Sequence, residues 1–176
     1  MKTGKKVYYI LPKDKDQAFF KSTGWFVRIA TVFIMKWTKG FNNNLSNVNN
    51  LNYKSQLFDA RFLNELDRSQ WQEIVQTVQN NVTDEVIKTA VHQLPKSIYA
   101  IDGDAITKKL ISRRNDLVAD AIKYYKHLNA VVKIDGTDED ERFELSGSGD
   151  SLRVQVFQKG KSNPFYNRSF SPKETK

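Results

Sequence analysis

Two aspartates one residue apart, Asp14 and Asp16, have the type and spacing best suited to chemistry in this chain. In extended backbone, residues i and i+2 project to the same side, so both carboxylates can face one point. A hard cation such as Mg²⁺ or Mn²⁺ prefers oxygen ligands of this kind and often bridges them to phosphate. Pro12 would fix the turn, and Phe19 and Phe20 would anchor the segment that follows. The other interpretation, which spacing alone favours, is a solvated turn with ion pairs to the neighbouring lysines.

An adjacent pair of arginines, Arg113 and Arg114, is the second candidate. At about 100° per residue, the two side chains lie on either side of the apolar stripe of a predicted helix. They could bind phosphate as a fork, or lie along the edge of the core and form structural ion pairs. Asp116 and Asp120 follow on the side of Arg113, and we therefore favour ion pairing.

The remaining candidates are an acidic stretch at 135–141 and the only two histidines. Asp138, Asp140 and Glu141 could bind Ca²⁺, but the stretch lacks the spacing of an EF-hand, which favours an acidic hairpin loop. His92 and His127 have no metal-ligand pattern around them and are expected on helix surfaces. No serine lies in a nucleophile-elbow pattern, so no catalytic residue is predicted.

These candidates would be positioned mainly by helices. A short strand is predicted over 7–11 and an apolar helix over 25–37, and an asparagine-rich loop follows. Further helices are predicted at four places: around Phe58, Phe62 and Leu66; from a capping box at Ser69 and Gln72; from Thr83 to Pro95; and from near Asp102 to Leu128. Residues of these helices are expected to form one core: Trp71, Ile74, Val78, Leu110, Leu117 and Tyr124.

After Asn129 the pattern changes from helical to strand-like. The segments 130–134, 142–146 and 152–157 predict a three-stranded antiparallel meander. The sequence therefore predicts an α+β fold: a helical bundle-like lobe with a short N-terminal strand and a C-terminal meander. Residues 1–128 would form the mainly helical part, 129–160 the meander of the same domain, and 161–176 a tail leading to a downstream region.

Composition limits the classes of function. The 176 residues carry a formal net charge of +8, with 39% hydrophobic residues and no cysteine. The chain can therefore build a core, whereas disulfides and thiolate zinc sites are excluded. The basic residues are scattered and no nucleic-acid motif accompanies them, so no nucleic-acid partner is expected. The apolar stretches are too short for a membrane span or a secretory signal.

The segment PKDKDQAFF resembles the P-[RW]-D-x-D-x-A-F motif of atypical kinases related to the spore-coat kinase CotH. A closer resemblance extends over most of the chain, to one region of large Bacteroidetes cell-envelope proteins. It is carried by YYILPKDKDQAFF, DARFLNELDRSQWQEIV, NVTDEVIKTAVHQLP, IYAIDGDAITKKLISRRNDL and YYKHLNAVVKIDGTDEDERFEL. Those proteins combine a calcineurin-like metallophosphoesterase, this region and a BamA-type outer-membrane barrel.

The resemblance implies that Asp14 and Asp16 stand where the kinase family binds its metal, Mg²⁺ or Mn²⁺. The G-N-W-D-R-H-like stretch that would supply a catalytic aspartate and the glycine-rich phosphate loop are both missing. We therefore expect a fragment: an accessory kinase-like lobe of a periplasmic or outer-membrane protein, inactive alone, with other domains of a larger polypeptide as partners. The alternatives are a phosphotransferase that uses the D-x-D site, and a structural spacer between phosphoesterase and barrel.

Overall fold

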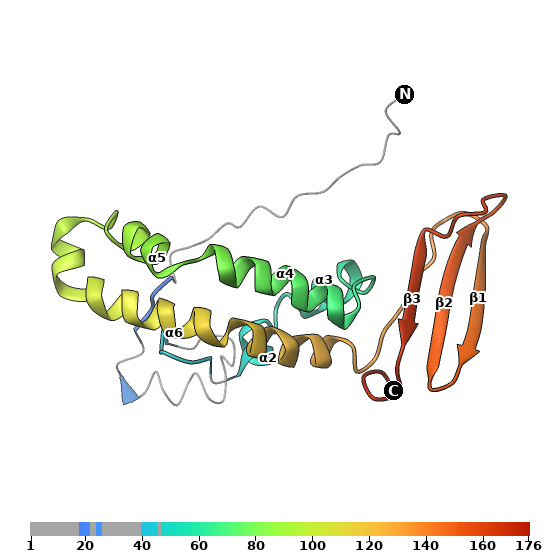
Figure 1. Cartoon of the computed structure of the whole chain (residues 1–176), viewed down its shortest axis with the longest axis horizontal. Coiled ribbons are helices and arrows are strands. Elements are labelled where there is room, and N and C mark those ends of the chain that lie inside the picture. The colour runs from blue at the N-terminus through green and yellow to red at the C-terminus, as the bar shows by residue number, and fades with distance from the viewer. Residues whose placement is uncertain (1–17, 22–23, 26–39, 46) are drawn as a thin grey trace, which may run out of the picture.

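The computed structural model describes residues 18–21, 24–25, 40–45 and 47–176. In these residues, five helices precede one three-stranded antiparallel sheet, as Figure 1 shows. The predicted α+β class is therefore confirmed. The strand predicted over 7–11 and all but the first residue of the helix predicted over 25–37 lie outside the described residues.

The helices form an elongated layer in which α4 lies beside the long helix α6 (Figure 1). Their bounds are Val48–Leu51 for α2, Gln56–Phe62 for α3, Arg68–Asn81 for α4, Asp84–Val91 for α5 and Lys96–Leu128 for α6. No described helix has an apolar stretch long enough to cross a membrane.

Helix α4 begins two residues earlier than the predicted capping box. Asp67 is the N-cap: its carboxylate accepts from the main-chain N–H of Gln70, and the Gln70 side chain accepts from the N–H of Asp67. Ser69 is already helical, and its hydroxyl donates to Asp67 over 2.7 Å. The prediction of Ser69 as the cap was wrong because an aspartate in extended backbone stood two residues before it.

The boundary between α5 and α6 also differs from the prediction. Thr83 caps α5 as expected, its hydroxyl accepting from the N–H of Val86. However, α5 ends at Val91, and Pro95 is the N-cap of α6, which begins at Lys96 instead of near Asp102. A proline has no N–H to leave unpaired at a helix start, so it can begin a helix as well as end one. The predicted end of α6 at Leu128 is confirmed.

The apolar core of the helical part is small. Ile87 and Val91 of α5 pack on Ile106 of α6, and all three side chains are buried. In the predicted core, Tyr124 is buried and Trp71 is partly buried. The prediction was wrong for two members: Ile74 is 52% exposed and Val78 is 47% exposed.

Helix α4 turns a polar residue towards α6 in place of those two side chains. The Gln79 amide donates to the main-chain oxygens of Arg114 and Asn115, over 2.7 and 3.0 Å. The inward face of α4 therefore follows Trp71, Val75 and Gln79, which are partly buried at a spacing of four. Hydrophobic periodicity could not detect this face because one of its members is an amide.

The sheet is a meander in the order β1-β2-β3, formed by Glu141–Ser148, Ser151–Gln158 and Tyr166–Phe170. Gly149, with φ of 57°, is the first of the two residues that join β1 to β2, where glycine is favoured. Two strands of the predicted meander, 142–146 and 152–157, lie in β1 and β2, but the prediction was wrong for the other strand. Residues 130–134 form no strand, and the third strand lies in the segment 161–176 that was predicted to be a tail.

Main-chain partners explain why 130–134 does not join the sheet. The Lys133 oxygen accepts from the side-chain amide of Asn64, and the Ala130 oxygen accepts from the main-chain N–H of Lys176. This connector is therefore bonded to the α3–α4 loop and to the C-terminal segment. Two sets of contacts that are distant in sequence outweigh the strand propensity of its β-branched residues.

Candidate functional site

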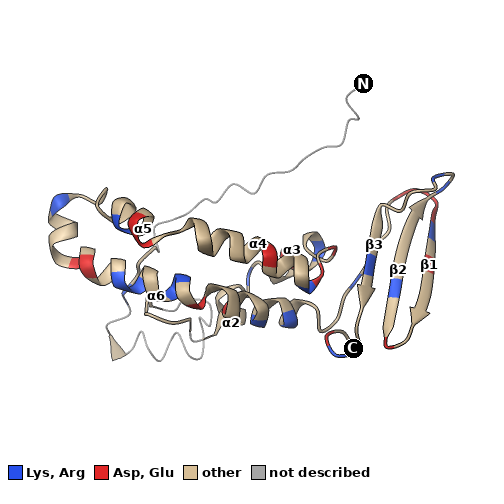
Figure 2. Ribbon diagram, in the orientation of Figure 1, with Lys and Arg blue, Asp and Glu red and all other residues tan. Residues whose placement is uncertain are grey.

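The aspartate pair Asp14 and Asp16 lies outside the described residues, so its cation site stays a prediction. Among the residues that the structure describes, no three His, Asp or Glu side chains gather as metal ligands would. Figure 2 shows acidic and basic residues both on the helices and on the sheet.

The acidic stretch at 135–141 is a connector from α6 to β1, and the hairpin-loop interpretation was wrong. The Glu141 carboxylate accepts from the main-chain N–H of Thr137 over 2.8 Å. Asp140 pairs with Lys159 over 2.5 Å, and Asp135 pairs with Lys133 over 2.8 Å. The hydrogen bond from Lys133 lowers the pKa of Asp135. Asp135, Asp140 and Glu141 are therefore each used in a contact within the chain.

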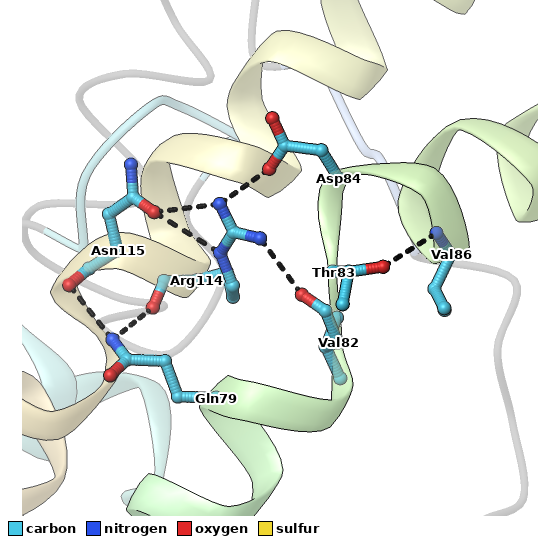
Figure 3. Close-up of polar contacts among 7 residues, drawn as sticks. All are labelled: Gln79, Val82, Thr83, Asp84, Val86, Arg114 and Asn115. Carbon is cyan, nitrogen blue, oxygen red and sulfur yellow. Dashed lines mark hydrogen bonds and ion pairs between the residues drawn. The ribbon is translucent and has the colours of Figure 1, made fainter.

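Arg114 is a structural link between three helices, as Figure 3 shows. One terminal nitrogen donates to the Asp84 carboxylate over 2.6 Å, and the other donates to the Val82 oxygen over 3.0 Å. The Asn115 side-chain oxygen accepts from Arg114 as well. The predicted ion pairing is confirmed for this arginine, but its partner lies at the start of α5 and not on α6. The link holds the α4–α5 turn against α6.

Arg113 was predicted to pair with Asp116 and Asp120, and that prediction was wrong in the described residues. Its guanidinium lies over the Phe41 ring, 4.2 Å from the ring centroid, and donates to the Asn42 oxygen over 2.8 Å. Asp120 is buried and instead accepts from Lys123. Burial lowers the pKa of Arg113. This arginine therefore packs the 40–45 segment onto α6.

The two histidines are surface residues, as predicted. His92 is exposed at the end of α5, where its ring stacks on Tyr99 with centroids 4.3 Å apart. The Tyr99 hydroxyl and Nε2 of His92 are 3.1 Å apart. His127 is exposed on α6. Neither has the surroundings of a metal ligand in the described part of the chain.

A buried polar cluster is centred on Arg168 of β3, which is 4% exposed. One terminal nitrogen donates to the main-chain oxygen of Asn64 over 2.5 Å. The other donates to the Asn129 side-chain oxygen over 2.6 Å and to the Tyr125 hydroxyl over 3.1 Å. Asn64 lies between α3 and α4, and the other two partners lie at the end of α6. We call this cluster, completed by Glu174, the Arg168 joint.

The Arg168 joint continues into the C-terminal segment. The Tyr125 hydroxyl donates to Glu174 over 3.1 Å, and Glu174 pairs with Arg68 at the start of α4 over 3.2 Å. The Tyr166 hydroxyl also donates to the Asn64 oxygen over 3.0 Å. Burial raises the pKa of both Tyr125 and Tyr166. The joint therefore fastens β3 and the C-terminal segment to three parts of the helical layer.

An open groove of about 610 Å³ lies between the sheet and the α6–β1 connector. Ile134, Leu152, Val154 and Phe170 provide its apolar wall. Neither the groove nor the Arg168 joint was predicted, because the sequence of β3 predicts a tail. An alternating Tyr166, Arg168 and Phe170 was the signal, and the charge in its middle concealed it.

Comparisons with protein-family models, with curated proteins and with solved structures found no match.

Proposed function

We propose that this chain is an accessory, kinase-like lobe of a larger cell-envelope polypeptide, without phosphotransfer activity of its own. The resemblance to the CotH-related region provides the class and the envelope location. The observation that carries the accessory role is the Arg168 joint. Perturbed buried polar groups are the usual starting point for an active site. Here such groups hold the sheet on the helices.

The bonds of the joint explain why it supports an accessory role. Arg168 is fixed by three acceptors, and its carbonyl partner also binds Tyr166. A phosphate-binding arginine presents its fork to a ligand, whereas both terminal nitrogens of Arg168 are used within the chain. The Arg114 link has the same character, since its guanidinium binds Val82, Asp84 and Asn115. Both arginines thus serve to hold elements together.

Asp14 and Asp16 would add a remnant cation site to this lobe. Two carboxylates without a third protein ligand leave most coordination positions to water, so Mg²⁺ or Mn²⁺ would bind weakly. Titration with Mn²⁺, followed by the relaxation of water protons, should show binding that is lost when Asp14→Asn and Asp16→Asn are combined. Identical curves for the two proteins would leave the pair as a solvated turn.

An ATP turnover assay with Mg²⁺ or Mn²⁺ tests the accessory role itself. We expect no turnover by this chain, because the phosphate-covering loop and lysine of a kinase have no counterpart in its sequence. Turnover that disappears in Asp16→Ala would overturn the accessory role and favour a phosphotransferase. A protein that binds Mn²⁺ without ATP turnover would support both the remnant cation site and the accessory role.

A further inference from the structure

The outer edge of β1 is open in the described part of the chain. Strand β1 pairs with β2 alone, and the sheet order β1-β2-β3 makes it an edge strand. Figure 1 shows β1 as the strand farthest from the helices, which meet the sheet on the β3 side. The described helices therefore do not obstruct the approach of another strand to this edge.

Strand β1 carries three charged residues, Glu141, Arg142 and Glu144, but it lacks the other features that usually protect an edge. Its eight residues pair with β2 in unbroken register, so no bulge twists the edge away. It contains no proline or lysine. On its apolar face, Phe143 is 46% exposed and Leu145 is 65% exposed. A long, regular edge strand with exposed apolar side chains favours pairing with a further strand.

We propose that the partner is a second copy of this chain, whose β1 pairs antiparallel with the first to form one continuous six-stranded sheet. Charge selects the register. Arg142 and Glu144 project from the same face of β1, where they pair over 3.2 Å. When the two-fold axis passes at Phe143, each Arg142 lies opposite Glu144 of the other copy. Opposite charges in directly facing positions stabilise such a pair.

The neighbouring registers lack this complementarity. An axis at Arg142 places two arginines opposite each other, and an axis at Glu144 places two glutamates there, both of which are destabilising. An axis at Leu145 places Arg142 opposite Ser148. The axis at Phe143 also brings the two Phe143 rings together on the apolar face, where aromatic cross-strand pairs are favourable. In this register each residue faces one that is an even number of positions away, so the apolar faces of both copies lie on the same side of the sheet.

Single charge reversals test both the surface and its register. Wild-type chain should show reversible dimerisation in sedimentation equilibrium. Arg142→Glu faces acid with acid in the homodimer, and Glu144→Arg faces base with base. Each single variant should therefore dimerise about tenfold more weakly than wild type, from two exposed pairs reversed. Unchanged circular dichroism, and an unchanged thermal midpoint at a concentration where all the proteins are monomeric, would show that each variant is folded.

Dimerisation in a mixture of the two single variants is the decisive measurement. An Arg142→Glu chain facing a Glu144→Arg chain restores both pairs between the copies, although neither chain regains its internal Arg142–Glu144 pair. The mixture should therefore form heterodimers at wild-type strength, as should the homodimer of the double variant. High salt should reduce all these differences.

Three results would overturn the proposal. The first is a wild-type chain that stays monomeric at every concentration, as it would if another segment or a different protein occupies the edge. The second is a mixture that dimerises no better than its components. The third is a dimer that is insensitive to these charges and also survives Leu145→Lys, which places a charge on the apolar face, because such a dimer uses another surface.

Discussion

The contact between α5 and α6 and the junction between the sheet and the helices are built from different chemistry. Three buried aliphatic side chains, Ile87, Val91 and Ile106, hold the first. Hydrogen bonds centred on one buried arginine hold the second. Aliphatic packing is non-directional, and each buried side chain contributes roughly 1.5–3 kcal/mol. A buried polar joint depends on geometry, because every group that loses its partner is left unsatisfied.

This difference predicts how each region fails. Truncation of one of these aliphatic side chains should weaken the α5–α6 contact in proportion to the side-chain volume removed. Loss of Arg168 should weaken the attachment of Asn64, Tyr125 and Asn129 to the sheet at once, since all three contact the same guanidinium. The sheet junction should therefore be the more sensitive of the two regions to a single substitution.

The largest effect is expected for Arg168→Leu. It leaves the buried Asn129 side-chain oxygen without its donor and removes one donor each from the Asn64 oxygen and the Tyr125 hydroxyl. We expect a loss of about 3–5 kcal/mol in the free energy of unfolding, measured by urea denaturation. Arg153→Leu is the matched control, because Arg153 is exposed on β2 and donates to Asn167. It should cost about 1 kcal/mol or less. Equal losses for the two variants would show that the Arg168 joint contributes no special stability.

An intermediate effect is expected for Ile106→Ala, at about 2–4 kcal/mol, because Ile106 is 6% exposed in the core cluster. Ile74→Ala is its control, because it removes the same atoms from another isoleucine. Ile74 is 52% exposed, so its truncation should cost well under half as much. Thermal unfolding followed by circular dichroism measures both. A larger loss of stability in Ile74→Ala than in Ile106→Ala would support the core that the sequence predicted, of which Ile74 is a member.

The smallest effect is expected at the N-cap of α4. Asp67→Ala should cost about 1 kcal/mol at neutral pH. Hydrogen bonds from the Gln70 N–H and the Ser69 hydroxyl lower the pKa of Asp67. A lowered pKa means that this stability is present above the ordinary value of about 4 and is lost as the pH falls through the folded pKa.

The difference between wild type and Asp67→Ala should therefore shrink in acid. Asp67→Asn keeps a capping oxygen without a titrating group, so its difference from Asp67→Ala should stay constant over the same pH range. Denaturation curves at several pH values measure both differences. A wild-type advantage over Asp67→Ala that persists in strong acid would contradict the role of the ionised carboxylate.

Sequence predicted the elements whose signals are local. Thr83 and the carboxylates after it marked the start of α5, and the apolar stripe ended α6 at Leu128. Asp67 is also a local signal, but Ser69 and Gln72 have the same capping-box spacing and conceal it. Gln79 and Arg168 could not be predicted in the same way. Each is a polar residue at an inward position, and its partners come from segments 35 to 104 residues away.

The same distinction, between local signals and partners distant in sequence, applies to the candidate sites. Ion pairing by Arg114 was predicted, but its partner Asp84 was not, because nothing local to α6 indicates which helix end lies beside it. The pairing of Arg113 was predicted from Asp116 and Asp120, whereas in the described residues it packs on Phe41. Asp14 and Asp16 stay a prediction from spacing and resemblance.

We expect Arg168 to make the sheet and the helical layer one cooperative unit. Native-state hydrogen exchange of the main-chain amides of β2, β3, α5 and α6 tests it most directly. In wild type, the sheet and the C-terminal half of α6 should open together. In Arg168→Leu, protection should fall in β2 and β3 and change little around Ile87 and Ile106. Equal protection of the sheet in both proteins would contradict the claim.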